Sequence, residues 1–255
     1  MSNPCNEDTI DDDRPNHIEE TTDAQRNRSP SPDGSIALTF ERRYYHCDSL
    51  FIKRNLRPSE YRMTQRGTLH VPRLGKERLQ NEAECLRFIR RTTDIPVPTV
   101  YGAFEINDSF YLITEYIQGI SMASLSEEQK RTVGLEIRQH LDTMHAIKSN
   151  TIGGPSGIVI PPYRAMRASA NDDWPARSSN TTEYVFCHND LSQQNIIVDP
   201  DTLRIRAIID WEYSGFFPEY FDSPFYERLG PSVALEGEND DVKSLLKFLC
   251  ISTSE

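Results

Sequence analysis

The chain has 255 residues, of which 37% are hydrophobic and 26% are charged, an ordinary balance for a globular protein that can bury a sizeable core. Its formal net charge of -11 argues against a nucleic-acid-binding surface, which needs a basic face, and no apolar run approaches the length of a membrane span. The five cysteines are far apart and contain no CxxC pair, which argues against a zinc site, favours a reducing compartment and leads us to expect a cytoplasmic protein.

The first 34 residues differ in composition from the rest of the chain. They contain nine acidic and three basic residues, four prolines and almost no large apolar side chain. Such a segment cannot bury enough apolar surface to offset its ordering entropy. We therefore predict a disordered acidic tail over residues 1–34.

Strands and one amphipathic helix are predicted for the next hundred residues. The segments 36–45 and 47–56 read as strands, and the second carries Lys53; residues 55–75 read as a loop. Residues 76–92 place Leu79, Ala83, Leu86 and Ile89 on one helical face and Phe88 off it. The prolines of TDIPVPTVYGAF (93–104) predict an extended connector, which leads to a strand at 110–116.

A second helix and three short strands are predicted further on. Ser126 and Gln129 have capping-box spacing at the start of a helix that continues through Met144. Residues 150–182 are rich in Gly, Pro, Ser and Asn and read mostly as loop. Strands follow at 184–187, 195–198 and 204–210, and a turn at 199–202 joins the last two.

Three polar residues are expected to meet at one end of the last hairpin. Asp190 and Asn195 lie five apart in the loop HNDLSQQN, and Asp210 ends the strand that folds back beside Asn195. Phosphoryl transfer needs such a set, with one carboxylate to accept the proton of the attacking hydroxyl and a carboxylate with an amide oxygen to hold Mg²⁺.

Each of these residues also has a structural interpretation. Asn195 could initiate a turn, Asp210 could cap a helix, and His188 fits a structural role, bracing the loop, better than a catalytic one. A metallohydrolase site built on His188 and Asp190 has less support, because no HExxH or other histidine cluster supplies further ligands. Order, spacing and strand context together favour the catalytic interpretation of Asp190, Asn195 and Asp210.

Lys53 and Glu82 form a second candidate pair. A kinase needs a cation on the nucleotide phosphates and an acid that holds this cation in place. The 100° rotation per residue turns Glu82 toward the apolar face of its helix, where a carboxylate is costly unless it is paired. We expect an ion pair with Lys53; the alternative is that Glu82 reaches the surface.

These motifs together resemble the aminoglycoside phosphotransferase family. The resemblance covers about residues 45–225 and rests on Lys53 followed by EAECL (82–86), IPVP (95–98), TEYIQG (114–119), HNDLSQQN (188–195) and IDWE (209–212). Within that family, TTDIPVPTVYGAF and IIDWEYSGFFPEYFD look like the members found in filamentous fungi.

The resemblance implies an α+β protein-kinase-like fold with ATP and Mg²⁺ bound between two lobes. The N-terminal lobe with its hinge would cover 35–117, as a small antiparallel sheet with one helix, and a mainly helical catalytic lobe would cover 118–255, shortened because only 44 residues follow Trp211. The resemblance implies that Asp190 is the catalytic base and that Asn195 and Asp210 are the Mg²⁺ ligands. Lys53 and Glu82 would form the phosphate anchor. The backbone of the hinge residues Glu115 and Ile117 would contact adenine, and Thr114 would lie at the back of the adenine pocket.

The departures from protein kinases favour a small-molecule substrate. Asn189 stands where arginine is expected, DWE replaces DFG, and no APE motif follows. No GxGxxG precedes Lys53, so the phosphate-covering hairpin would come from about residues 35–50, which lack glycine. We expect a kinase for a hydroxyl-bearing small molecule. The acids Glu212, Glu219 and Asp222 suggest a cationic acceptor, and the alternative function is a catalytically inactive kinase-like binding module. The sequence does not indicate an oligomeric state.

Overall fold

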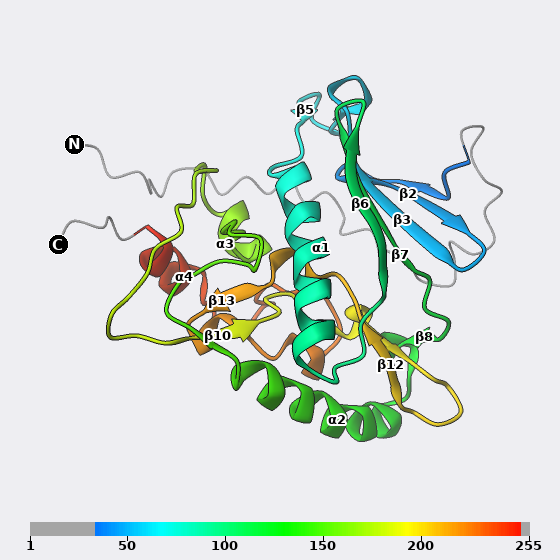
Figure 1. Cartoon of the computed structure of the whole chain (residues 1–255), viewed down its shortest axis with the longest axis vertical. Helices are drawn as coiled ribbons and strands as arrows, with labels where there is room; N and C mark the ends of the chain where they lie inside the picture. The colour runs from blue at the N-terminus through cyan, green and yellow to red at the C-terminus, as the bar shows by residue number, and fades with distance from the viewer. Residues whose placement is uncertain (1–33, 251–255) are drawn as a thin grey trace.

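The computed structural model describes residues 34–250, so the predicted tail lies outside the described residues except for Gly34. A twisted five-stranded antiparallel sheet stands beside one long helix, and a second, larger group of helices and short strands lies below them (Figure 1). We call these groups the small lobe and the large lobe. No helix within residues 34–250 is long and apolar enough to cross a membrane.

The small lobe is built on a sheet with the order β1-β2-β3-β7-β6. A separate two-stranded hairpin, β4–β5, lies at its far end, and the helix α1 packs against the sheet (Figure 1). The elements are β1 (Ala37–Leu38), β2 (Arg42–Cys47), β3 (Leu50–Asn55), η2 (Pro58–Glu60), β4 (Arg62–Met63), β5 (Leu69–His70), α1 (Gly75–Thr92), β6 (Val100–Ile106) and β7 (Ser109–Glu115).

The large lobe combines helices with two three-stranded sheets, ordered β13-β10-β9 and β12-β11-β8. Its elements are β8 (Ile120–Ser121), η3 (Met122–Ser124), α2 (Glu127–His145), β9 (Lys148–Ser149), α3 (Tyr163–Arg167), β10 (Tyr184–Cys187), η4 (Gln193–Asn195), β11 (Ile196–Val198), β12 (Ile205–Ile208), η5 (Trp211–Tyr213), β13 (Gly215–Phe217), η6 (Glu219–Phe221), η7 (Phe225–Glu227) and α4 (Val242–Leu249).

The predicted capping box of α2 is confirmed. Ser126 is the N-cap, its hydroxyl accepts a hydrogen bond from the Gln129 backbone N–H, and the Gln129 side chain accepts one from the Ser126 N–H. Two of the four unpaired donors at the helix start are thereby satisfied. The predicted hairpin is present as well, because Ile196 pairs with Ile208 and Asp199 Oδ1 accepts hydrogen bonds from the Asp201 and Thr202 backbone N–H groups.

One of three local predictions was wrong, and the other two hold with an addition. Residues 100–106 belong to β6 rather than to a connector, because pairing with β7 satisfies their backbone groups once the prolines at 96 and 98 are passed. The loop over 150–182 contains the short helix α3. Phe88 lies off the main face of α1, but its side chain still packs against the large lobe. The centroid of its ring lies 5.2 Å from that of Phe186 and 5.9 Å from that of Phe216.

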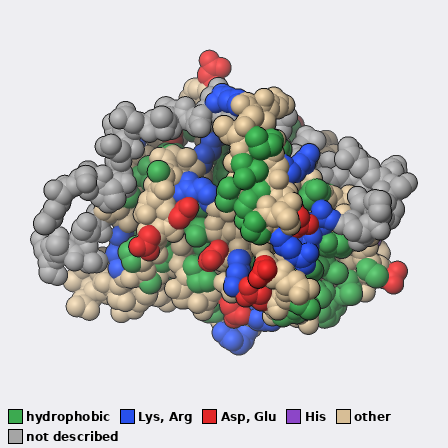
Figure 2. Space-filling view, turned by 90° about the horizontal axis from the view of Figure 1, so that it is seen from above, with side chains coloured by type: hydrophobic (Ala, Val, Ile, Leu, Met, Phe, Trp, Pro, Cys, Tyr) green, Lys and Arg blue, Asp and Glu red, His purple; other side chains and the backbone are tan. Residues whose placement is uncertain are grey.

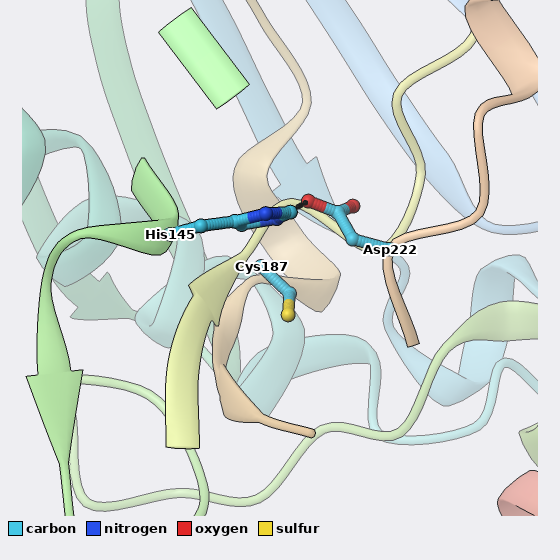
Figure 3. Close-up of side chains that lie close together, drawn as sticks. All are labelled: His145, Cys187 and Asp222. Atoms are coloured by element: carbon cyan, nitrogen blue, oxygen red, sulfur yellow. Dashed lines mark hydrogen bonds and ion pairs between the residues drawn. The ribbon is translucent and has the colours of Figure 1, made fainter. Parts of the chain in front are cut away.

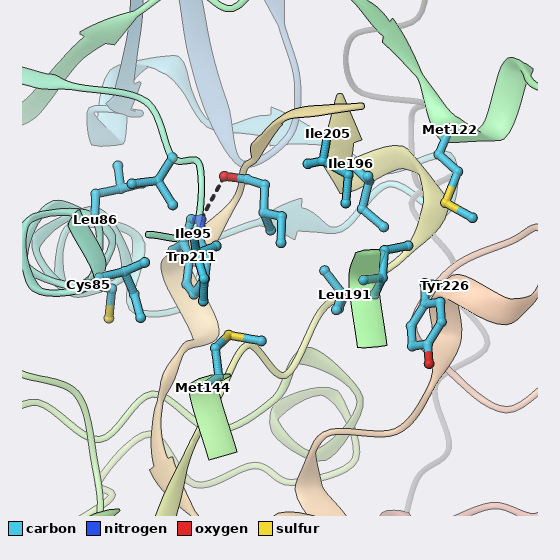
Figure 4. Close-up of a cluster of buried hydrophobic side chains, with 14 of the residues drawn as sticks. Cys85, Leu86, Ile95, Met122, Met144, Leu191, Ile196, Ile205, Trp211 and Tyr226 are labelled. Carbon is cyan, nitrogen blue, oxygen red and sulfur yellow. Dashed lines mark hydrogen bonds between the residues drawn. The ribbon is translucent and has the colours of Figure 1, made fainter. Parts of the chain in front are cut away.

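One buried cluster joins the two lobes. It combines the apolar face of α1, including Leu86, with Trp211 in η5 (Figure 4). Phe186 on β10 belongs to the same cluster. The Trp211 indole N–H donates to the Ile208 carbonyl oxygen at 2.8 Å, so the ring that fills the cluster also fixes the chain just after β12 (Figure 4). This contact sets the position of Asp210, which lies between the two residues.

The far end of the small lobe exposes several large hydrophobic side chains. Those with about half of their surface exposed are Met63, Leu69, Val71, Phe104 and Ile106. Figure 2 looks down on the molecule from above and shows hydrophobic side chains gathered near the middle of this face.

Candidate active site

Lys53 and Glu82 are brought together by the packing of α1 against β3. Lys53 lies opposite Tyr44 and Leu112 in the sheet, and its Nζ donates to Glu82 Oε1 at 2.8 Å. The Glu82 side chain is only 3% exposed, so the predicted inward orientation and the ion pair are both confirmed and the surface alternative is wrong. Lys53 Nζ also donates to Asp210 Oδ1.

His188 is a bracing residue rather than a member of the pocket. It is fully buried, its Nε2 donates to the Ile209 carbonyl at 3.0 Å, and its Nδ1 accepts from the Asp190 backbone N–H at 3.3 Å. A carbonyl can only accept and an N–H can only donate, so these partners select one neutral tautomer. Burial also lowers the pKa of His188, which keeps the ring neutral. The predicted structural role of His188 is confirmed.

Asp190 and Asn195 are joined inside the loop between β10 and β11. Asn195 donates from Nδ2 to the Asp190 backbone carbonyl at 2.8 Å and to its Oδ2 at 3.2 Å. The loop makes its sharp turn at Asn189, whose φ of 67° is left-handed, a region that asparagine tolerates better than most residues. The Asn189 side chain donates to the Tyr213 carbonyl at 2.8 Å, which ties this turn to η5.

Asp210 reaches the same place from the other strand. The Ile209 N–H donates to the Asn195 carbonyl at 2.9 Å and extends the hairpin by one rung, and Asp210 then turns away with φ 65° and ψ 53°. Asp210 precedes η5, but its side chain makes no capping hydrogen bond there. The capping interpretation of this carboxylate is therefore wrong.

One pocket between the lobes collects the polar groups. Its lining includes Lys53 from the small lobe and three residues that the sequence placed together, namely Asp190, Asn195 and Asp210. The turn between β1 and β2 also lines it through residues 39–41, where the Thr39 hydroxyl accepts from the Glu41 and Arg42 backbone N–H groups at 3.1 and 2.9 Å. The Thr39 side chain thus closes the turn in a segment that carries no GxGxxG motif.

Burial changes the proton affinities in this pocket. Burial, together with the nearby charges of Asp210 and Glu212, raises the pKa of Asp190 to about 7, although the hydrogen bond from Asn195 acts in the opposite direction. Burial by itself would lower the pKa of Lys53, but the carboxylates of Asp210 and Glu82 outweigh it and keep the ammonium charged. A carboxylate with a pKa near neutrality suits a general base.

The three hinge residues are not part of this pocket. The Thr114 hydroxyl donates to the Phe51 carbonyl at 3.4 Å, and Glu115 Oε2 accepts from the Thr99 hydroxyl at 2.7 Å. The Tyr116 N–H donates to the Ser49 carbonyl at 2.7 Å. Neither Thr114, Glu115 nor Ile117 lines the pocket, so their predicted contact with adenine stays a prediction.

Two arginines of the site were not predicted from the sequence. Arg42 Nη2 and Arg78 Nη2 each donate to one oxygen of Glu212 at 2.6 Å, and all three side chains line the pocket. The one available signal was Arg78, which precedes Glu82 by four residues and so lies on the same helical face. Arg42 gave no local signal, because its partner is 170 residues away.

Asp222 braces the loop between β10 and β11 from behind. Its Oδ1 accepts from the Asn189 backbone N–H at 3.0 Å, and its Oδ2 accepts from the His188 N–H at 3.3 Å and is 3.1 Å from His145 Nε2 (Figure 3). The Cys187 sulfur completes a group whose ligand atoms lie within 4.8 Å of one another, but it points away from the His145–Asp222 pair in Figure 3. We interpret this group as a brace, since protein donors already hold both oxygens of Asp222.

These contacts correct the basis of the cationic-acceptor prediction. Glu212 is held by two arginines, and Asp222 by two backbone N–H groups and His145. Only Glu219 of the three acids is largely exposed, with 70% of its side chain accessible. Glu212 and Asp222 therefore do not offer an acceptor an unpaired negative charge.

The residues present fit a bound Mg²⁺. Asn195 uses its amide nitrogen on Asp190, which leaves the amide oxygen as the ligand atom, and Asp210 supplies a carboxylate on the same pocket wall. Carboxylate and amide oxygens are the hard ligands that Mg²⁺ prefers.

One segment of the chain matches a known protein family. Residues 160–223, which include Asp190, Asn195 and Asp210, match the model of the phosphotransferase enzyme family. The aminoglycoside 3'-phosphotransferase of Streptomyces fradiae is 25% identical over 154 residues, which are 52% of this chain and 57% of that relative, so the match spans little more than half of its length.

Solved structures are similar in fold. The GDP complex of an aminoglycoside 2'-phosphotransferase of type IIIa aligns with a TM-score of 0.50 and 12% identity, covering 74% of this chain and 68% of that one. The APH(3'')-Id enzyme of Streptomyces rimosus aligns with a TM-score of 0.47 and 20% identity, covering 70% of each chain. The chain has the kinase-like fold of the aminoglycoside phosphotransferases, and its residues 160–223 match the phosphotransferase enzyme family.

Proposed function

We propose that the chain is a kinase that transfers the γ-phosphate of ATP to a hydroxyl group of a small molecule. One observation carries the proposal: Lys53, Asp190, Asn195 and Asp210, from three separate segments, line one pocket. The match of residues 160–223 to a phosphotransferase family supports the reaction class. The similar structure solved with GDP supports a purine nucleotide as the ligand between the lobes.

The proposed roles follow from the contacts of each residue. Asp190 accepts the proton of the acceptor hydroxyl while the oxygen of that hydroxyl bonds to the γ-phosphorus. The bond from this phosphorus to the β–γ bridging oxygen breaks, and ADP is released. Lys53, held by Glu82, pairs with the phosphates. Asn195 and Asp210 would hold Mg²⁺, which screens the phosphate charge when it is bound. The adenine would contact the hinge at Thr114, Glu115 and Ile117.

Nucleotide binding can be tested before any acceptor is known. We expect Mg²⁺ and ATP together to raise the melting temperature of the protein, and we expect this shift to disappear in Asp210→Ala. ATP without Mg²⁺ is the control. A wild-type protein that shows no Mg²⁺-dependent shift would instead support a kinase-like binding module that has lost catalysis.

Transfer is tested with a panel of hydroxyl-bearing acceptors. Sugars, amino sugars and choline-like alcohols should be offered with Mg²⁺-ATP, and phosphorylated product should be quantified by mass spectrometry. We expect product with at least one acceptor and none above background with Asp190→Ala. Because Glu212 and Asp222 are already paired, each amino sugar should be compared with the parent sugar that carries a hydroxyl in place of the amine.

A further inference from the structure

Glu212 ties three separate elements together at the edge of the pocket. Each of its carboxylate oxygens accepts from one arginine at 2.6 Å, Oε2 from Arg42 and Oε1 from Arg78. The side chains of Arg42, Arg78 and Glu212 are 2%, 5% and 13% exposed, so water screens these contacts little. We call these three residues the Glu212 clasp.

The clasp joins the segments that carry the proposed phosphate-handling residues. Arg42 begins β2, directly after the turn that lines the pocket, and Arg78 lies one helical turn before Glu82 on α1. Glu212 follows Asp210 by two residues. A shift of α1 relative to both η5 and β3 would therefore break the clasp and the Lys53–Glu82 pair together.

Further contacts fix the same junction. Asn81, on α1, donates from Nδ2 to the backbone carbonyls of Glu212 at 3.1 Å and Ser214 at 2.8 Å. The Arg78 guanidinium lies 5.0 Å from the centre of the Tyr213 ring and also donates to Glu41 Oε2 at 2.7 Å. The Glu212 side chain thus holds both β2 and α1 to the segment after Asp210.

We infer that Glu212 is a positioning residue that acts through Arg42 and Arg78 to hold α1 where Glu82 stays paired with Lys53. The catalytic consequence rests on the proposed kinase function. In protein kinases the matching lysine–glutamate pair forms only when the helix is in place, and phosphorylation of a loop often supplies the charge that holds it. Here a carboxylate built into the chain supplies that charge permanently.

The small lobe offers a matched control for a merely structural ion pair. Glu60 is also held by two arginines, with Arg54 Nη1 at 2.6 Å from Oε2 and Arg43 Nη2 at 3.2 Å from Oε1. Its side chain is 17% exposed, close to the value for Glu212, but Glu60 does not line the pocket. Glu60→Gln therefore removes a comparable charge without touching α1 or Asp210.

The test compares Glu212→Gln with Glu60→Gln by hydrogen exchange and by kinetics. We expect amide exchange within residues 75–92 to become at least about tenfold faster in Glu212→Gln, and to stay within about twofold of wild type in Glu60→Gln. With an acceptor found in the panel, we expect kcat to fall by at least about tenfold in Glu212→Gln only. Melting temperatures show whether the two variants are destabilised to a similar degree.

The exchange measurement stands apart from catalysis. If the wild-type protein transfers no phosphate, the proposed function fails, while slow exchange in α1 that becomes fast only in Glu212→Gln still supports the clasp. Equal exchange in α1 for the two variants would overturn the inference, as would an unchanged kcat in Glu212→Gln. If Glu212→Gln does not fold, Arg42→Lys takes its place, because lysine keeps the charge but has no guanidinium group to reach Glu212. Arg54→Lys is then the control.

Discussion

Lys53 on β3 donates from Nζ to Oε1 of Glu82 on α1, and these two atoms lie 2.8 Å apart. Glu82 is almost fully buried beneath the lysine, whereas the second partner of Lys53, the carboxylate of Asp210, lines the pocket. In the proposed function, a phosphate group that enters the pocket would therefore meet Lys53 from the side of Asp210. Glu82 would keep its ion pair, while Asp210 would give up its own to bind a metal ion.

This arrangement predicts that Lys53 and Glu82 are needed for turnover of ATP. We expect Lys53→Met to lower kcat/KM for ATP by on the order of a hundredfold, as the loss of one preorganised charge contact does in other enzymes. Glu82→Gln should lower kcat/KM for ATP as well, because Lys53 then loses its buried carboxylate partner. Lys76→Met is the matched control, since Lys76 pairs with Glu105 at 2.5 Å on the outside of the small lobe. A loss of equal size in Lys76→Met would contradict the role of Lys53.

Asp190 should make the stability of the protein depend on pH. Its pKa rises to about 7 in the folded protein from an ordinary value of 3.8, mainly through burial. Between these two values the folded chain binds more protons than the unfolded chain, so this contribution to stability is present at low pH and is lost as the pH rises through about 7. Above that pH, the folded protein carries the cost of a buried carboxylate.

We therefore expect Asp190→Asn to raise the melting temperature at pH 8 by at least about 2 °C and to have a smaller effect at pH 5. The same variant should lose phosphate transfer at both values. The exposed Asp201→Asn removes one charge from the same lobe and is the control. Melting curves at both pH values give the comparison, and an effect of Asp190→Asn that is equal at pH 5 and pH 8 would contradict the shifted pKa.

The elements near the centre of the site could be predicted because their signals are local. Helical periodicity turns Glu82 inward, and a short turn between two strands places Asn195 next to the segment that ends in Asp210. In both cases the relevant geometry extends over fewer than twenty residues, so backbone dihedrals and hydrogen-bonding rules are sufficient.

The rest of the site depends on long-range packing that a single sequence does not encode locally. Glu212 looked like an acid available to a cationic acceptor, but Arg42 and Arg78 reach it from the other lobe. Asp222 was assigned to the acceptor side for the same reason, and it holds the backbone of the loop between β10 and β11 instead. In both cases, the partner that satisfies a buried carboxylate comes from a distant segment.

Gly134 offers a way to stabilise the large lobe without touching the site. It lies inside α2, where glycine costs about 1 kcal/mol relative to alanine, and a Cβ at this position would meet only the Arg138 Nη2 atom, at 3.9 Å. We expect Gly134→Ala to raise the free energy of unfolding by about 0.5–1 kcal/mol. Urea denaturation measures this change. Gly215→Ala is the contrasting variant, because its Cβ would lie 2.7 Å from the Gly153 backbone, and it should destabilise the protein.

Two histidines on α2 should respond to pH in opposite directions. Burial alone would lower the pKa of His145, but the hydrogen bond to Asp222 and the charges of Asp222 and Glu219 outweigh burial and the opposing charge of Lys148, so its pKa is raised. Burial lowers the pKa of His140, and the charge of Glu136 does not offset it. The charged form of His145 is therefore favoured in the folded protein, whereas the charged form of His140 is disfavoured.

The sign of each effect follows from linkage. The raised pKa of His145 contributes stability that is fully present below about pH 6.5 and is lost as the pH rises through the folded-state pKa. The lowered pKa of His140 contributes stability that is present above about pH 6.5 and is lost as the pH falls through the folded-state pKa. We expect His145→Gln to lower the melting temperature more at pH 5.5 than at pH 8.5, by a difference of about 2 °C or more. His140→Gln should show the opposite trend.

His145→Gln should in addition slow phosphate transfer, because Asp222, the partner of His145, also holds the backbone N–H groups of His188 and Asn189. A His145→Gln variant with wild-type kcat at both pH values would show that Asp222 holds this backbone without the histidine.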